Sequence, residues 1–186
     1  MKLIDNIKDK LGLRKIKKNL KSKKRNIRIT NFANAKSIGI IYPISTTDYQ
    51  DFINKYIDFL RGEIGFKKIV SLGYYEGAQL PNFIVNDLFK YKYFTKKQLD
   101  FSRFGKSYEV KEFIKEDFDI LVDLSRDFVV PIKHVVANSH AGLKIGWHSI
   151  QNEKYFDFMV EMNKTAPVSH FIKEVNAFLT KVKPKR

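Results

Sequence analysis

Side chains that could catalyse a reaction or hold a metal are few in this sequence. There is no cysteine, so thiol nucleophiles and cysteine metal sites are excluded. The histidines show neither HxxxH nor HExxH spacing and are expected to be ordinary surface or half-buried residues: His134, His140, His148 and His170. We predict no metal site, no cofactor and no catalytic residue.

Two segments partly resemble phosphate-binding loops. The segment "FGKS" (104–107) has the Gly-Lys-Ser end of such a loop, but the required earlier glycine is replaced by Asp100. Ser107 is better explained as a helix cap. The turn "YPISTTDYQ" (42–50) has no glycine for close approach to a pyrophosphate. Thr46 and Thr47 could hold an anion at the next helix N-terminus, although capping alone accounts for them.

Asp119 and Asp123 lie four residues apart in "DFDILVDLS" (117–125), so on a strand they share one face. Paired carboxylates can act as acid and base, but at the ends of a buried strand they more often cap backbone groups or meet a lysine. Asp123 is the better candidate, because open α/β sheets bind ligands at the carboxyl ends of parallel strands. The residues of such a ligand crevice would be Thr46, Asp48, Asp123 and Ser125.

The strongest feature is the charge of the N-terminal segment. The net charge is +15, and residues 1–30 carry twelve Lys/Arg and two Asp, a net of +10. Residues 2–24 have the spacing of a helix, with apolar stripes Leu3–Ile4–Ile7–Leu11 and Leu13–Ile16–Leu20 that shift at Gly12. The expected phosphate-binding residues are Arg14, Lys15, Lys17, Lys18, Lys21, Lys23, Lys24, Arg25 and Arg28.

A polyanion is the natural partner of this segment. The sequence predicts a non-enzymatic protein that docks on RNA or the ribosome through a basic helix. An anionic membrane surface is a second possibility, with Leu3, Ile4, Ile7 and Leu11 buried among lipids. The sequence is also compatible with a solvated tail, with docking of the apolar stripe on a protein or on the sheet itself, and with a small-ligand or sugar-phosphate site in the crevice.

The rest of the chain alternates between strand and helix patterns. Strands are expected at 37–43, 67–75, 117–125, 141–147 and 155–162, and helices at 45–65, 107–116, 131–139 and 167–182. This order predicts one Rossmann-like α/β three-layer sandwich with a mostly parallel sheet of about five strands. The last two strands, close together around "SIQNEK", are expected to pair as an antiparallel hairpin.

The domain organisation follows from these patterns. We predict a basic helical extension (1–30), the α/β domain (31–183) and a basic tail (184–186). Residues 76–106 look irregular, with room for a short strand and a helical turn, and Tyr91 and Tyr93 there are either core residues or base-stacking residues beside lysines. With 186 residues, no cysteine and no apolar run long enough to cross a bilayer, the chain is expected to be cytoplasmic.

Two resemblances follow from the strand order. The stretch from "NAKSIGIIYP" through "FDILVDLS" and "AGLKIGW" to "FIKEVNAFL" resembles an uncharacterised bacterial family of short basic proteins, which implies this fold and no particular activity. Locally, 118–147 is similar to the N-terminal lobe of heptosyltransferases, through Asp119, Asp123, Leu124, Ala141, Ile145 and Gly146. The Gly-Asp turn with the catalytic acid and the second lobe are missing, so the likeness implies one Rossmann-like lobe and argues against transferase activity.

Overall fold

The fold is built on six parallel strands. The computed structural model describes residues 2–22, 25–84, 91–163 and 165–183. In chain order the strands are β1 (Ser37–Pro43), β2 (Lys68–Tyr75), β3 (Tyr91–Thr95), β4 (Ile120–Asp123), β5 (Leu143–Trp147) and β6 (Phe158–Val160). They lie in the sheet order β3-β2-β1-β4-β5-β6, so the order reverses between β1 and β4. The predicted Rossmann-like α/β fold is confirmed, with β3 as a sixth strand inside the segment that looked irregular.

The expected antiparallel hairpin at the sheet edge is wrong. β5 and β6 are parallel, with Gly146 beside Met159. Residues 148–157 run back from the carboxyl end of β5 to the end of the sheet where β5 begins, and β6 starts there. The aromatic residues Tyr155 and Phe156 of this connection are buried. A side chain at Gly146 would overlap the Phe156 ring, so this glycine makes room for the returning segment. Burial of the connection thus decides the direction of β6, which a short separation in sequence does not indicate.

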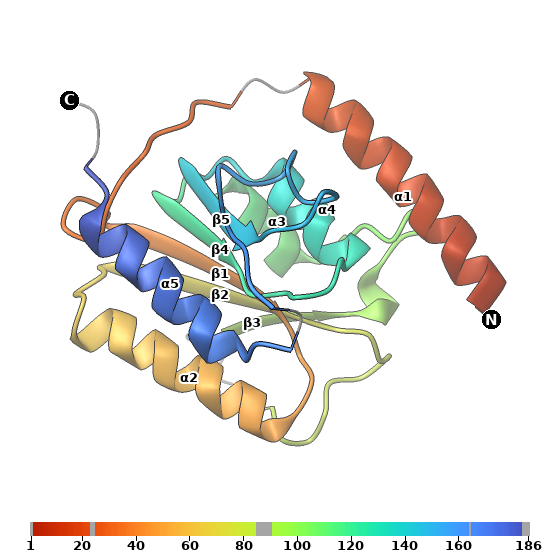
Figure 1. Ribbon diagram of the computed structural model, residues 1–186. Coiled ribbons are helices and arrows are strands. Elements are labelled where there is room, and N and C mark those ends of the chain that lie inside the picture. The colour runs from red at the N-terminus through yellow and green to blue at the C-terminus, as the bar shows by residue number, and fades with distance from the viewer. Residues whose placement is uncertain (1, 23–24, 85–90, 164, 184–186) are drawn as a thin grey trace.

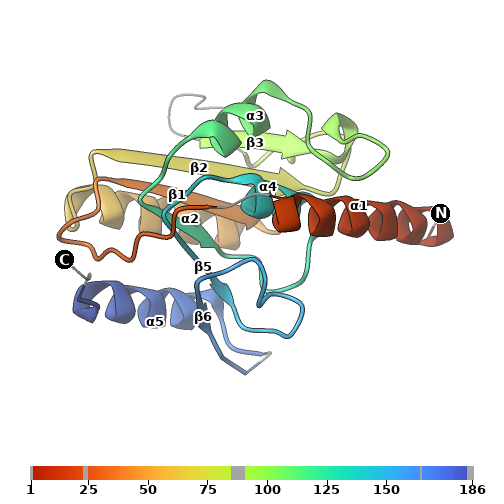
Figure 2. The ribbon, with the colours of Figure 1, turned by 90° about the horizontal axis from the view of Figure 1, so that it is seen from above.

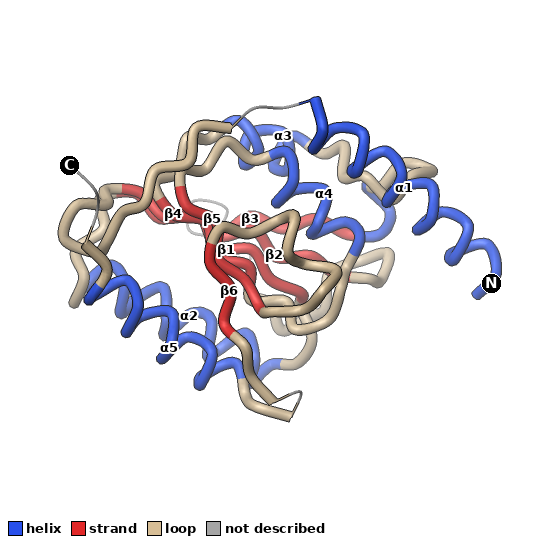
Figure 3. The backbone as a smooth tube through the Cα atoms, turned by 45° about the horizontal axis from the view of Figure 1, so that its top comes forward, coloured by secondary structure: helices blue, strands red, loops and turns tan. Residues whose placement is uncertain are grey.

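Helices cover both faces of the sheet. α2 (Thr47–Gly62) and α5 (Val168–Lys181) lie on one face, and α3 (Tyr108–Lys115) and α4 (Val130–Asn138) lie on the other (Figures 1 and 3). A 3-10 turn, η1 (Lys96–Gln98), follows β3. Thr46 and Ser107 cap α2 and α3 by accepting from backbone N–H groups, as expected from the sequence. None of the described helices is long and apolar enough to cross a bilayer.

The strands divide their side chains between two cores. Alternation sends Ile40 and Val122 toward α2 and α5, and Ile41 and Leu121 toward α3 and α4. Tyr91 and Tyr93 belong to the first core and are buried. The core interpretation of these two tyrosines is therefore confirmed, and they present no free rings for stacking on bases.

The N-terminal helix, α1 (Lys2–Ser22), forms an additional layer outside α4 (Figures 1 and 2). Eight of the nine α4 residues are buried, because the sheet covers one side of the helix and α1 covers another. Ile16 of α1 is fully buried, and Leu13 and Leu20 are half-buried on the same apolar cluster. A helix that is apolar on every side needs such a cover to leave water.

Gly12 lies close against the body of the protein. A Cβ atom there would overlap the Ser102 carbonyl oxygen and lie 3.0 Å from Val130 Cγ1. The glycine that interrupts the helical pattern thus lets α1 lie against the loop after β3.

We expect Gly12→Ala to lower the free energy of unfolding, although glycine-to-alanine changes in helices usually raise it by about 1 kcal/mol. The reason is that the methyl group meets backbone, which cannot turn away as a side chain can. Gly62→Ala in α2 is the matched control, because no atom lies within 4 Å of a Cβ built there. Urea titrations of both variants measure the difference, and a stabilised Gly12→Ala protein would contradict this account of α1 packing.

Candidate nucleic-acid interface

The acidic side chains of α1 point toward the body and hold the helix in place. Arg103 donates to both carboxylate oxygens of Glu76 at 2.8 and 2.9 Å, and its Nε lies 3.1 Å from the Asp9 carboxylate. Lys96 lies 3.6 Å from Asp5. Both acids of α1 therefore meet cations of the loop after β3, and Arg103 is itself buried.

Glu76 is the centre of this network. Burial alone would raise the pKa of Glu76, but hydrogen bonds from Arg103 and Tyr74 and the charge of Arg103 together hold the pKa of its carboxyl below the ordinary value. Tyr74 donates its hydroxyl to Glu76 at 2.6 Å. The carboxylate thus stays ionised and anchors the arginine that binds α1.

Most basic side chains of α1 are exposed, whereas Lys8 is half-buried and lies over the Phe101 ring at 5.4 Å. Lys10, Arg14, Lys15, Lys17, Lys18 and Lys21 are all exposed, and we call this set the cationic face. None of the six forms an ion pair with a residue in the described part of the chain. Lys15 lies over the Phe104 ring at 5.9 Å. Since α1 is 21 residues long, these charges extend over much of a rod of about 31 Å.

The nine predicted phosphate-binding residues are not all in this set. Five of them, Arg14, Lys15, Lys17, Lys18 and Lys21, belong to the cationic face. The structure gives the two arginines that follow α1 internal partners, described next. Lys23 and Lys24 lie outside the described residues.

Arg25 and Arg28 fix the segment between α1 and β1 to residues that come just before β4, β5 and β6. Arg25 forms an ion pair with Asp157 and donates to the Gly142 carbonyl at 2.8 Å. Arg28 pairs with Asp117 at 2.7 Å. Both guanidinium groups thus have internal partners, and their first role is to hold the chain in place.

The two apolar stripes of α1 have different surroundings. The second stripe, Leu13–Ile16–Leu20, packs on the body, as described above. In the first stripe, Ile4 is 56% exposed and Ile7 is 49% exposed. They lie near the N-terminal end of the helix, away from the last two turns where Lys17, Lys18 and Lys21 gather.

The predicted ligand crevice is only partly open. Asp123 is fully buried, accepts from Lys133 at 2.6 Å and accepts from both the backbone N–H and the hydroxyl of Ser125. Lys133 is also fully buried, with its ammonium 4.8 Å from the centre of the Phe156 ring. Asp123 therefore meets a lysine, the structural role that the sequence left open. Asp119 likewise accepts from the backbone N–H groups of Lys36 and Ser37.

The other two crevice residues lie at the start of α2. Thr46 caps that helix by accepting from the Tyr49 N–H at 3.2 Å, and Asp48 is exposed in its first turn. A cavity of about 290 Å³ lies beside them, with Tyr49, Arg126 and Trp147 in its wall. Burial, with a smaller effect of the Asp123 charge, raises the pKa of Tyr49 well above its ordinary value, so its hydroxyl remains protonated.

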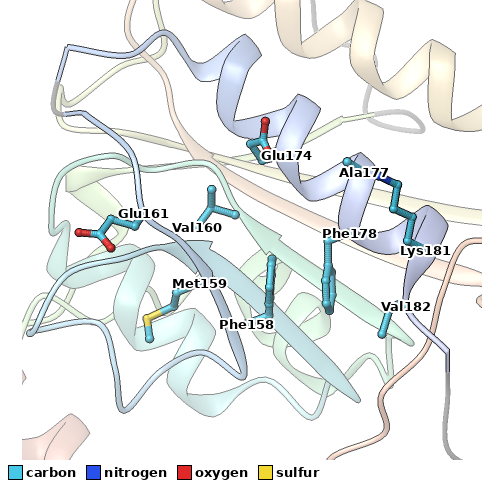
Figure 4. A pocket seen from close by; sticks show the side chains of 9 residues that line it. All are labelled: Phe158, Met159, Val160, Glu161, Glu174, Ala177, Phe178, Lys181 and Val182. Atoms are coloured by element: carbon cyan, nitrogen blue, oxygen red, sulfur yellow. The ribbon is translucent and has the colours of Figure 1, made fainter.

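Another hollow lies at the β6 edge of the sheet. Side chains of β6 and α5 line a groove of about 530 Å³, in which the Phe158 and Phe178 rings stack at 3.6 Å (Figure 4). Glu161 and Glu174 lie on this groove together with Lys181. This mixed-charge surface is poorly suited to a polyanion. In the described part of the chain no three His, Asp or Glu side chains gather as metal ligands would.

Several important residues were missed by the sequence analysis. Arg103, Glu76 and Lys133 hold α1 and α4 in place, and each forms its ion pair with a residue of another element or loop. One signal was available for Lys133: it is the single charged residue in the apolar helix "VPIKHVVAN" (130–138). A charge in such a helix is buried and needs a partner of opposite charge.

Comparison with known proteins identifies a family. The sequence profile of a family of unknown function (DUF6913) matches residues 8–182, which is nearly the whole chain. No curated protein and no solved structure is significantly similar to the chain. The match begins inside α1, so most of the cationic helix is part of the stretch that defines the family, while the likeness to heptosyltransferases stays a sequence-based prediction.

We expect Lys133→Met to lower the free energy of unfolding by about 3–5 kcal/mol, because it leaves the Asp123 carboxylate buried without its cation. Combining it with Asp123→Asn removes that buried charge, and the double variant should recover part of the loss. Denaturant titrations of the wild type, the two single variants and the double variant measure the coupling. A double variant that is less stable by the sum of the single losses would show that the pair does not interact.

The lowered pKa of Glu76 predicts a dependence of stability on pH. A carboxyl whose pKa is lower in the folded state adds stability above its ordinary value of 4.5, and this stability is lost as the pH falls below it. Glu76→Gln should therefore be less stable than the wild type at neutral pH, and the difference should shrink toward about pH 3. A difference that is the same at both pH values would contradict the assigned role of the carboxylate.

Proposed function

Since this chain belongs to the family of unknown function DUF6913, we propose its function from its own surface: it is a non-enzymatic protein that docks on RNA, free or in the ribosome, through the cationic face of α1. The observation that supports this proposal is the division of charge on α1. The acids Asp5 and Asp9 meet cations of the body, and the exposed cations have no acidic partner among the described residues.

Unpaired, exposed cations in a row are suited to a phosphate backbone. Each Lys or Arg that meets a phosphate releases condensed counterions, so several contacts together give useful affinity that falls steeply with salt. Because α1 packs on α4 and is held by Arg103, these cations are presented from one rigid side of the molecule. Little conformational entropy of the backbone is then lost on binding.

A second candidate is an anionic membrane surface, which is favoured by the exposed Ile4 and Ile7. The buried position of Ile16 weighs against it, because the apolar side of α1 in its second half is used by α4. Only the N-terminal end of the helix could then enter lipid. An RNA partner would use the whole cationic face, which extends to the other end of the helix.

We expect the triple variant Lys17→Glu, Lys18→Glu, Lys21→Glu to bind RNA at least about tenfold more weakly than the wild type at low salt. The slope of log K against log salt should also become shallower by about two. The matched control reverses Lys55, Lys67 and Lys173, which are exposed elsewhere on the molecule and give the same change in net charge. Fluorescence anisotropy with a labelled RNA measures both variants.

Equal losses in the two triple variants would mean that net charge, and not the cationic face, governs binding. Flotation with vesicles of anionic and of neutral lipid tests the second candidate in parallel. If the wild type floats with anionic vesicles and does not bind RNA, the membrane takes the place of RNA as the partner.

A further inference from the structure

A seam runs along one side of α1, where the helix meets the connection between β5 and β6. Two hollows lie in this seam. The first, of about 310 Å³, is lined by Leu13, Arg14, Lys17, Phe128, Gln151 and Lys154. The second, of about 420 Å³, lies beside the C-terminal turn of α1 at Leu20 and includes Lys154 again, with Arg25, Asn138, Ser139, His140 and Tyr155. Lys154 therefore lines both hollows, which are neighbours beside the cationic face.

Each hollow combines an aromatic ring with cations. In the first hollow, the half-buried Phe128 lies among Arg14, Lys17 and Lys154. In the second, Tyr155 lies beneath the Lys154 ammonium, which is 5.2 Å from the centre of its ring. The Phe128 and Tyr155 rings are 5.7 Å apart and meet edge to face, so the buried Tyr155 ring supports Phe128.

Most polar groups of the second hollow are buried or already paired. The buried hydroxyl of Tyr155 has no hydrogen-bond partner among the described residues, and burial raises its pKa to about 12, so it remains a donor at neutral pH. The Asp157 carboxylate there is already neutralised by Arg25 and accepts the Lys144 backbone N–H at 2.8 Å. Glu153, on the rim, is exposed and opposes any phosphate close to it.

The seam is better suited to single-stranded RNA than to an RNA duplex. In a duplex the bases are stacked inside, and the deep, narrow major groove of A-form RNA does not admit side chains for readout. The body also flanks α1 on both sides, with Phe104 near Lys15 and Lys154 across the first hollow from Lys17, so the helix does not stand free to enter a groove. A single strand can turn its bases outward onto rings while its phosphates follow the cations.

We propose that the seam between α1 and the β5–β6 connection binds single-stranded RNA, with phosphates on Arg14, Lys17 and Lys154 and an unstacked base on Phe128 in the first hollow. The inference rests on the proposed function, since it names the form of RNA that the cationic face would hold. Phe128, which is half-buried, is the stacking residue of the first hollow, and Lys154 extends the cationic side of the seam to the second hollow.

The test compares a labelled single-stranded oligonucleotide with its perfectly paired duplex. For the full-length wild type we expect at least about tenfold tighter binding of the single strand at equal salt. Lys154→Glu should weaken single-strand binding by about tenfold and change duplex binding by much less. Lys173→Glu is the matched control, because this lysine is exposed on α5 and lies in neither hollow.

A second variant tests the ring separately from charge. Phe128→Leu keeps an apolar side chain but removes the stacking surface, and it should weaken single-strand binding by about tenfold without changing the slope of log K against log salt. Unfolding curves and circular dichroism establish that each variant is folded. A loss of affinity together with an unchanged salt slope is a result that a general loss of charge would not give.

The outcomes separate this inference from the proposed function. Equal affinity for single strand and duplex, or equal losses of both in Lys154→Glu, would overturn the single-strand inference and leave RNA docking on α1 intact. Wild-type protein that binds neither form at low salt would overturn both. Tighter single-strand binding that is lost in Lys154→Glu and in Phe128→Leu, and kept in Lys173→Glu, would support the seam as the site.

Discussion

The structure depends on one packing constraint: α4 is apolar on nearly every side and must be covered on two. The sheet covers one side, and the single charged residue of the helix, Lys133, turns inward to Asp123 at the end of β4. The opposite side would lie open to water without α1. Ile16 and the close approach at Gly12 supply that cover, so the N-terminal helix is held by the same apolar contacts that complete the core.

This constraint also determines which charges α1 exposes. Once its apolar side is on α4, the acids Asp5 and Asp9 lie close to Lys96 and Arg103, and the six cations of the cationic face remain exposed without an acidic partner among the described residues. Binding and stability are therefore coupled in this helix. Removing α1 altogether would uncover α4, so a truncated protein that fails to bind RNA would not distinguish a lost contact from a lost fold. Reversing exposed lysines avoids this difficulty.

Much of the fold could be predicted from local sequence patterns. The β-branched run before Pro43 and the apolar run ending at Asp123 each form a parallel strand, and the capping residues Thr46 and Ser107 begin the expected helices. The direction of β6 could not be predicted, because it depends on burial of the connection before it. On α1, helical spacing correctly predicted that most of the lysines are exposed. The pairing of Arg25 with Asp157 could not be predicted, because the two residues are 132 positions apart and no local sequence pattern indicates the contact.

The buried pair of Asp123 and Lys133 changes what the end of β4 can do. In open α/β sheets the carboxyl ends of the strands beside the reversal of strand order are the usual place for ligands, and Asp123 stands there. Its two oxygens are occupied by Ser125 and Lys133, so in this protein the carboxylate stabilises α4. A charge that elsewhere could hold a ligand here holds the helix on which α1 rests. The sheet thus acts as a support, and the surface with unpaired charge is displaced outward to α1 and the seam beside it.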